Sequence, residues 1–148
     1  MSDANISTIT DDQLVVAAKK VLDNAYCPYS KFQVGAAILT DSGKIFKGAN
    51  YENASYPVGV CAERVALGAA LSTGHRCFTK IAIATTLDEP GAPCGMCRQA
   101  IAEFGSNIQL ILCSTTSDKR IIHSISHLLP YAFTSESLPK KMINDVSK

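Results

Sequence analysis

The sequence of 148 residues contains no tryptophan, 7% aromatic residues and 18% charged residues. Its 14 Lys and Arg against 13 Asp and Glu leave a net charge of +1, without the basic excess of nucleic-acid or membrane-surface proteins. No apolar run approaches the length of a membrane span, and the first residues lack the basic start and apolar core of a signal peptide. We therefore expect a cytoplasmic protein without a polynucleotide or membrane partner.

Six cysteines are present, although disulfides are not needed for stability. A chain of this size buries roughly 70% of its unfolded surface, and in a reducing compartment a thiol is free, reactive or bound to a metal. Cys77 and Cys113 lie beside apolar runs and are predicted to pack in the core. Cys27 is predicted to lie in the core or in a turn. The remaining three, Cys61, Cys94 and Cys97, are candidates for metal binding.

The apolar pattern predicts alternating helices and strands. One apolar helical face and a capping box of Thr10 and Gln13 predict the first helix, which Pro28 ends. A turn at 41–43 joins two strands into a hairpin, and Gly74 ends a further helix. The predicted elements, in chain order, are a helix at 11–26, strands at 32–39 and 44–50, a helix at 61–74, a strand at 78–86, a helix at 95–105, strands at 107–114 and 120–124, and a short helix at 124–130.

This order of elements predicts an α/β fold. Strands that are separated by helices imply right-handed crossovers, so we expect a five-stranded mixed, largely parallel sheet. Helices on both faces would make it a three-layer sandwich. We expect a single domain over residues 1–148, with its core at about 11–133 and a polar tail from Tyr131 onward.

Three cysteines stand at two predicted helix starts. Cys94 and Cys97 form P-C-G-M-C, a spacing common in zinc sites, and Cys61 begins the helix at 61–74. The partial positive charge and free N–H groups of a helix start favour thiolate over thiol. Two helix starts that meet above one sheet edge would bring three thiolates together, which leaves the fourth tetrahedral position of a zinc ion open for water. Glu63 then supplies a carboxylate near that water.

Two other interpretations of these cysteines stay open at this point. A C-x-x-C pair after a strand is also typical of a thioredoxin-like redox motif. A structural zinc module would take Cys27, Cys77 or Cys113 as its fourth ligand. Glu63 discriminates between the two kinds of zinc site, because a closed site of four cysteines has no use for a neighbouring carboxylate.

The segments C-A-E-R at 61–64 and P-C-G-M-C-R-Q at 93–99 resemble the zinc-dependent cytidine deaminase family, whose signature has His or Cys as the first ligand. The resemblance spans residues 11 to 133. The other matching segments are Y-C-P-Y-S at 26–30, F-x-V-G-A at 32–36, G-A-N-x-E-N-A at 48–54 and L-L-P at 128–130. They resemble the small homotetrameric branch of the family, which acts on free nucleosides.

The resemblance implies a hydrolase that acts on a cyclic amidine C–N bond, converts cytidine and deoxycytidine to uridine and deoxyuridine, and releases ammonia in pyrimidine salvage. It implies one Zn²⁺ per subunit, held by Cys61, Cys94 and Cys97, which lowers the pKa of its bound water to roughly 7. Zinc-bound hydroxide would attack C4 while Glu63 shuttles protons to N3 and to the leaving amine. Arg64 would hydrogen-bond the ligand sulfurs and offset their negative charge.

The same resemblance assigns substrate-binding residues. Asn50 and Glu52 match the pair that hydrogen-bonds the ribose hydroxyls, although loop capping is another role for such residues. The backbone N–H of Ala62 would contact the pyrimidine. Phe32 would pack against the nucleoside, whereas on pattern alone a strand phenylalanine belongs to the core.

Two aromatic residues match positions that reach into a neighbouring subunit. Tyr56 and Phe133 would complete the active site of another copy, which implies a homotetramer with shared sites. The alternative within the enzymes is a relative that acts on another aminopyrimidine or on a base within a polynucleotide. The near-neutral charge weighs against a polynucleotide, because binding one needs contacts to many phosphates.

Overall fold

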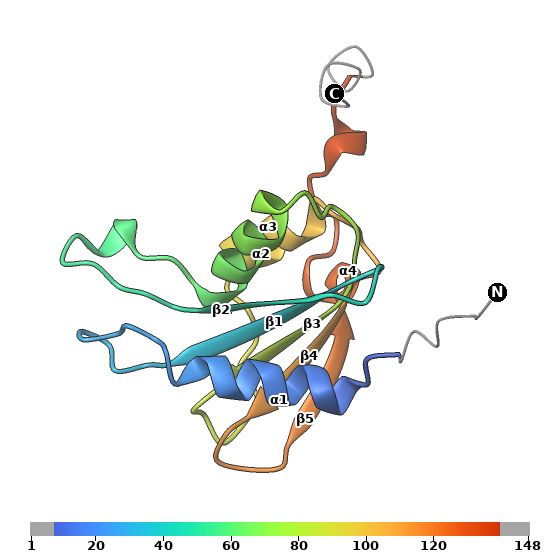
Figure 1. Ribbon diagram of the computed structural model, residues 1–148. Coiled ribbons are helices and arrows are strands. Elements are labelled where there is room, and N and C mark those ends of the chain that lie inside the picture. Colours follow the sequence, from blue (N-terminus) through green and yellow to red (C-terminus); the bar gives the residue numbers. More distant parts are fainter. Residues whose placement is uncertain (1–7, 140–148) are drawn as a thin grey trace.

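The computed structural model describes residues 8–139 (Figure 1). Every predicted helix and strand is present within slightly different bounds, whereas the 3-10 turns η1 and η2 lie where no element was predicted. Residues 1–7 and the end of the predicted polar tail, 140–148, lie outside the described residues. The elements are α1 (Asp11–Leu22), β1 (Val34–Thr40), β2 (Ile45–Ala49), η1 (Tyr56–Val58), α2 (Ala62–Ser72), β3 (Phe78–Thr85), α3 (Gly95–Ala102), β4 (Gln109–Ser114), β5 (Arg120–Ser124), α4 (Ile125–Leu128) and η2 (Ser135–Ser137).

The strands form one five-stranded mixed sheet in the order β2-β1-β3-β4-β5. Helix α1 covers one face, and α2, α3 and α4 cover the other (Figure 1). This arrangement confirms the predicted three-layer α/β sandwich. None of the helices within residues 8–139 has the length and hydropathy of a membrane-spanning segment.

The prediction of a largely parallel sheet is wrong. Among the described strands, β3 and β4 pair in parallel, whereas β1 pairs antiparallel with both β2 and β3, and β5 pairs antiparallel with β4. Strands β2 and β3, which α2 connects, do run in the same direction, as a crossover connection requires. However, β1 lies between them and opposes both. The order of elements along the chain indicates that β2 and β3 run in the same direction. It does not indicate that β1 lies between them.

Side chains of the central strand β3 alternate between the two faces. Ile81 and Ile83 face the core beneath α2, α3 and α4, whereas Ala82 and Ala84 face α1. Helix α1 has the predicted capping box, with Thr10 and Gln13 each bonded to the backbone of the other. Small alanines on the α1 face let that helix pack closely on the sheet. The larger side chains of β3, Ile81 and Ile83, lie on the opposite face.

The start of α2 lies tightly against β2 because of Gly48. A Cβ atom added to Gly48 would stand 2.4 Å from the Ala66 nitrogen and 2.5 Å from the Ala62 carbonyl oxygen. Real Cβ atoms do not approach backbone this closely, so only glycine permits this packing. Gly48 thereby determines how near the first turn of α2 comes to the sheet.

The three cysteines outside the predicted metal site have different surroundings. Cys113 is buried as predicted, and together with Ile111 it extends from β4 into the core beneath α1. The prediction for Cys77 is wrong, since this residue is exposed. It precedes β3 in a loop, and the next residue, Phe78, takes the buried position. Cys27 is half-buried, and its carbonyl oxygen accepts a hydrogen bond from the Lys31 N–H at 3.0 Å.

Candidate active site

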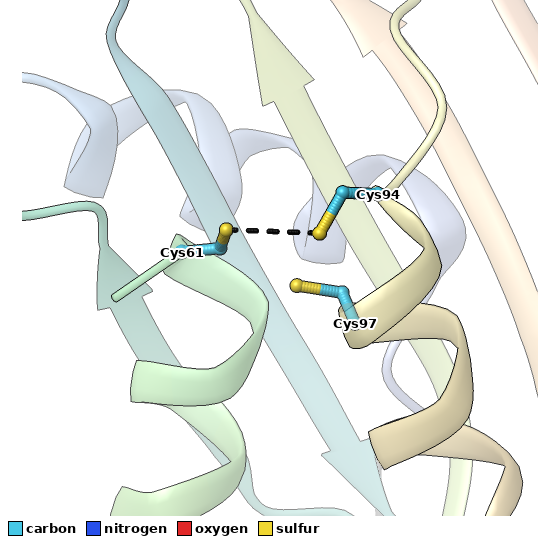
Figure 2. A group of neighbouring side chains, drawn as sticks. All are labelled: Cys61, Cys94 and Cys97. Carbon is cyan, nitrogen blue, oxygen red and sulfur yellow. Dashed lines mark hydrogen bonds between the residues drawn. The ribbon is translucent and has the colours of Figure 1, made fainter. Parts of the chain in front are cut away.

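Three cysteine thiols converge between the starts of α2 and α3. Cys61 and Cys94 are the N-cap residues of these two helices, and Cys97 lies in the first turn of α3. Figure 2 shows the three side chains pointing toward one another from the two helix starts. The sulfur atoms all lie within 4.8 Å of one another, and Cys61 Sγ is 3.9 Å from Cys94 Sγ. The predicted meeting of two helix starts is confirmed.

This cluster fits one zinc ion. With Zn–S bonds of about 2.3 Å, tetrahedral geometry places two ligand sulfurs about 3.8 Å apart, close to the 3.9 Å between Cys61 and Cys94. Within residues 8–139 the cluster contains three potential ligands, and Cys27, Cys77 and Cys113 are not among them. The geometry therefore favours an open site with three protein ligands over a closed site of four cysteines. The third thiol, on another helix, also distinguishes it from a two-cysteine redox motif.

The local charges favour a thiolate at Cys61. A hydrogen bond from Cys97, supported by the Arg64 guanidinium and by Cys94, lowers the pKa of the Cys61 thiol to about 5. The pKa of Cys97 is raised, mainly because its hydrogen bond to Cys61 holds its proton. Metal binding therefore releases a proton from this pair, and the affinity for the metal will rise with pH.

Two arginines lie close to the cysteines in the sequence and have different contacts. The Nη2 atom of Arg64 lies 4.0 Å from Cys61 Sγ, where its positive charge faces the ligand sulfur. Arg98 donates from Nε to the Pro93 carbonyl oxygen at 2.7 Å and from Nη1 to the Leu128 carbonyl oxygen at 2.9 Å. It thus joins the loop before Cys94 to α4. Sequence reasoning assigned Arg98 no role, although its place directly after Cys97 was a signal that it lies beside the site.

Glu63 is buried beside the three thiols. It is the second residue of α2, and only 4% of its surface is exposed. Burial raises the pKa of its carboxyl, and the negative charge of Cys61 raises the pKa further. Its side chain lines the same small cavity as Cys61 and Cys94. The carboxyl therefore shares a cavity with two of the three cysteines, and its catalytic role stays a prediction.

The cavity has a volume of about 190 Å³. It is lined by Phe32, Val34, Asn50, Cys61, Glu63, Thr85, Ala92 and Cys94. Phe32 and Asn50 were predicted to bind the nucleoside, and Ala62 stands at the helix start between Cys61 and Glu63. Phe32 is 37% exposed and is thus not a core residue. Sequence reasoning missed Thr85, the last residue of β3, which only the sheet brings to this cavity.

Asn50 holds the edge of the cavity in shape. Its Oδ1 accepts a hydrogen bond from the Val34 N–H at 2.8 Å, and its Nδ2 donates to the Phe32 carbonyl oxygen at 2.8 Å. These two bonds keep Phe32 beside the cavity. Asn50 therefore has a structural role at the site in addition to any contact with a ligand.

Glu52 does not line this cavity. It lies at a second hollow of about 330 Å³, together with Tyr29, Ser30 and Tyr56. Its carboxylate accepts hydrogen bonds from the Tyr29 N–H at 2.9 Å, from the Ser30 N–H at 3.1 Å and from the Ser30 hydroxyl. The hydroxyl bond is the main reason that the pKa of Glu52 is lowered. Glu52 thus caps the turn after Pro28, and Asn50 and Glu52 do not meet at one cavity.

Tyr56 and Phe133 are well exposed and are not among the residues that line the cavity. Tyr56 is 73% exposed in η1, and its ring centroid is 5.6 Å from that of Tyr29. Phe133 is 62% exposed, and its carbonyl oxygen accepts a hydrogen bond from Gln99 Nε2 at 2.7 Å. That bond ties the segment after α4 to α3.

Residues 8–114 match the family model described as the cytidine and deoxycytidylate deaminase zinc-binding region. Together with the three-thiol cluster, this match defines the protein as a zinc-dependent deaminase. Cytidine deaminase from Halalkalibacterium halodurans is 44% identical over 126 residues, which are 84% of this chain and 95% of the relative. The chain belongs to the cytidine deaminase family.

Two further comparisons agree with this assignment. Cytidine deaminase from Sporosarcina psychrophila is 40% identical over 127 residues, which are 86% of this chain and 93% of the relative. The crystal structure of cytidine deaminase from Burkholderia pseudomallei has a TM-score of 0.81 and 44% identity, and the match covers 84% of this chain and all of that one (100%). The sequence-based assignment of family, fold class and zinc as cofactor is confirmed.

Proposed function

We propose that this enzyme hydrolyses cytidine and deoxycytidine to uridine and deoxyuridine, with release of ammonia. The observation that carries the proposal is the buried Glu63 carboxyl, which shares one small cavity with two of the three clustered cysteines. The relatives named cytidine deaminase support the choice of substrate. Cys61, Cys94 and Cys97 would hold the zinc ion, one in each subunit.

Glu63 acts as the proton shuttle. When bound, zinc supplies a Lewis acid that makes water nucleophilic at neutral pH. Glu63 takes a proton from the water that attacks C4 and passes it to N3 of the base. It then transfers the second proton to the departing amine, so that one carboxyl group serves first as base and then as acid. Its burial keeps competing water away from these transfers.

Arg64 offsets the charge of the ligands. Three thiolates and one Zn²⁺ sum to a charge of −1, which opposes the removal of a proton from water near the metal. The guanidinium group beside Cys61 Sγ counters that charge, as do the positive ends of α2 and α3. Arg64 thereby supports the reaction without touching the nucleoside.

Phe32, Asn50, Glu52 and the Ala62 N–H bind the nucleoside in this proposal. Phe32 and Asn50 already line the cavity, and the start of α2 presents backbone N–H groups beside it. Glu52 would bind the ribose from the adjoining loop after exchanging its hydrogen bonds to Ser30 and Tyr29. Asn50 is thus expected to act from the wall of the cavity, whereas Glu52 has to reach the ribose from a neighbouring hollow.

Tyr56 and Phe133 complete the site of a neighbouring subunit in a homotetramer. Their exposure on this chain supports the proposal, because each ring is free to contact another copy. We further propose that one domain carries the whole activity, that it acts in the cytoplasm, and that it serves pyrimidine salvage. The free cysteines suit the reducing conditions of that compartment.

The test is a turnover assay of the zinc-loaded enzyme with cytidine and with deoxycytidine. We expect loss of the cytosine absorbance with an equal amount of ammonia released. Glu63→Gln should lower kcat by at least about 10²-fold while the zinc content and the fold stay unchanged. Glu103→Gln, at the exposed end of α3, is the matched control and should retain full activity. An inactive enzyme with zinc bound, or an active Glu63→Gln variant, would contradict the proposal.

A further inference from the structure

Thr85 carries a buried hydroxyl that has no hydrogen-bond partner among the described residues. Only 3% of the residue is exposed, and its side chain lines the cavity together with Glu63 and Cys94. Most buried hydroxyls in proteins are hydrogen-bonded, because an unpaired one loses its bonds to water without replacing them. The Thr85 hydroxyl is therefore available to hydrogen-bond a molecule that enters the cavity.

The position of Thr85 is set by the sheet. Its backbone pairs with Val34 on one side and Ser114 on the other, and its carbonyl oxygen accepts a hydrogen bond from the Thr115 N–H at 2.9 Å. Strand alternation places it on the same face as Ile81 and Ile83, the face that α2 and α3 cover. The hydroxyl is therefore held rigidly at the carboxyl end of a central strand.

A glycine leaves room beside this side chain. A Cβ atom added to Gly91 would stand 3.1 Å from Thr85 Cγ2 and 3.3 Å from Thr85 Oγ1. Both distances are shorter than ordinary van der Waals contacts, so a larger residue at 91 would crowd the threonine. The loop before Cys94 thus passes close to the hydroxyl without bonding to it.

The other polar side chains around the cavity already have roles. The Asn50 amide is bonded to Val34 and Phe32 through both its oxygen and its nitrogen. Cys61 and Cys94 belong to the metal cluster, and Glu63 carries protons in the proposed reaction. Thr85 is the remaining polar side chain on a wall that otherwise consists of Phe32, Val34 and Ala92.

We propose that the Thr85 hydroxyl is a further substrate-binding group, which hydrogen-bonds the pyrimidine base in the cavity. A hydroxyl can both donate and accept a hydrogen bond, and it rotates to suit its partner. It can therefore bind the base of the substrate, with its amino group, and that of the product, with a carbonyl oxygen in the same place. This inference rests on the proposed deamination of cytidine.

The test compares Thr85→Val, which replaces the hydroxyl by a methyl group of similar size, with Thr85→Ser, which keeps the hydroxyl. Thr85→Val should lower kcat/KM for cytidine by roughly 3- to 10-fold and raise the inhibition constant of uridine by a similar factor. Its zinc content should be unchanged, and its Tm should be equal or higher, because an unpaired buried hydroxyl is removed. Thr85→Ser should stay within about twofold of the unsubstituted enzyme, since the hydroxyl remains.

Thr40→Val is the matched control. Thr40 is also buried at the end of a strand, but its hydroxyl accepts a hydrogen bond from the Lys44 N–H at 3.0 Å and lies 3.0 Å from Ser42 Oγ. This substitution should lower the Tm and leave kcat/KM unchanged, which is the opposite of the expected pattern for Thr85. Thr85→Ala provides a second variant without the hydroxyl in case the valine does not fit.

Three outcomes would overturn the role of Thr85. The first is that kcat/KM and the inhibition constant of uridine are unchanged in both Thr85→Val and Thr85→Ala. The second is that kcat/KM falls as much in Thr85→Ser as in Thr85→Val. The third is that kcat/KM falls only in proportion to a loss of bound zinc. A failure of the unsubstituted, zinc-loaded enzyme to turn over cytidine would contradict the proposed function instead. Calorimetric binding of uridine to the unsubstituted and Thr85→Val proteins would then decide the role of Thr85 by itself.

Discussion

The metal end and the ribose end of the candidate site are built differently. At the metal end, Cys97 and Glu63 are buried, and the ligands stand on two helix starts packed against the sheet. At the ribose end, Glu52 is half-buried and Tyr56 is exposed, and both lie outside the strands of the sheet and its long helices. Glu63 and Cys97, proposed for chemistry, thus belong to the buried part of this chain, whereas Glu52 and Tyr56, proposed for binding the sugar or a neighbouring copy, are more accessible.

This difference has a physical reason. Proton transfer and metal binding require atoms held to a fraction of an ångström, and buried helix starts on a sheet supply that rigidity. A sugar ring needs polar groups that can exchange water for ligand, and such groups are less costly to keep on a surface. We therefore expect substitutions at the metal end to change stability and turnover together, and those at the ribose end to change mainly KM.

The largest effect is expected at the metal cluster. Cys94→Ala removes one of the three ligands, so the bound zinc and the activity should fall to background and the Tm should drop, because metal binding contributes to folding. Zinc analysis, the cytidine assay and thermal unfolding measure these changes. Cys77→Ala, at an exposed cysteine outside the cluster, is the control and should change none of them. If the Cys94→Ala protein keeps one zinc per chain, the ligand set is wrong.

The next largest effect is expected where α2 meets the sheet. Gly48→Ala would place its Cβ within 2.5 Å of backbone atoms of α2. Such overpacking costs about 1–3 kcal/mol of unfolding free energy, and the displaced helix start should lower kcat by roughly tenfold or more. Denaturant unfolding and turnover measure the two effects.

Gly68→Ala is the control for this second prediction. Gly68 lies in α2, the helix that packs against Gly48, and a Cβ atom added to Gly68 would meet no atom within 4 Å. This substitution should leave turnover unchanged and stabilise the helix by up to about 1 kcal/mol. Equal effects of the two substitutions would show that the close approach at Gly48 does not position the site.

A smaller effect on turnover is expected for Asn50, which lies between the two ends. Asn50→Ala removes the hydrogen bonds to Val34 and Phe32, so it should cost about 1–3 kcal/mol of unfolding free energy. It should also raise KM for cytidine more than it lowers kcat, because Phe32 loses its support. Asn24→Ala, at an exposed position after α1, is the control. A change in kcat alone would assign Asn50 to the metal end.

The smallest effect on stability is expected for Glu52. Its folded pKa is lowered, mainly by the hydrogen bond from Ser30. A carboxyl of this kind stabilises the turn at neutral pH, and that stabilisation is lost as the pH falls through the folded pKa, below the usual value of about 4.3. Observing the Tyr29 and Ser30 amides by NMR during an acid titration measures this loss. Glu52→Gln should shift the same amides at pH 7 and raise KM while kcat stays near its original value.

Much of the fold and of the metal end was predictable from local sequence patterns. The capping box of α1, the glycine after α2 and the period of apolar residues each involve neighbours within a few positions along the chain. The spacing of Cys94 and Cys97, with Glu63 two residues after Cys61, carried the prediction of an open zinc site. Those residues stand at helix starts, whose geometry is itself local.

The tertiary structure decided the features that depend on distant segments. Strand β1 takes the place between β2 and β3, Glu52 bonds to the turn at Ser30, and Thr85 reaches the cavity from the end of β3. None of these pairings leaves a signal in nearby residues, because each joins segments far apart in the chain. The sequence by itself therefore determined which residues have the chemistry of a zinc-dependent deaminase, and packing across the sheet decided which of them share one cavity.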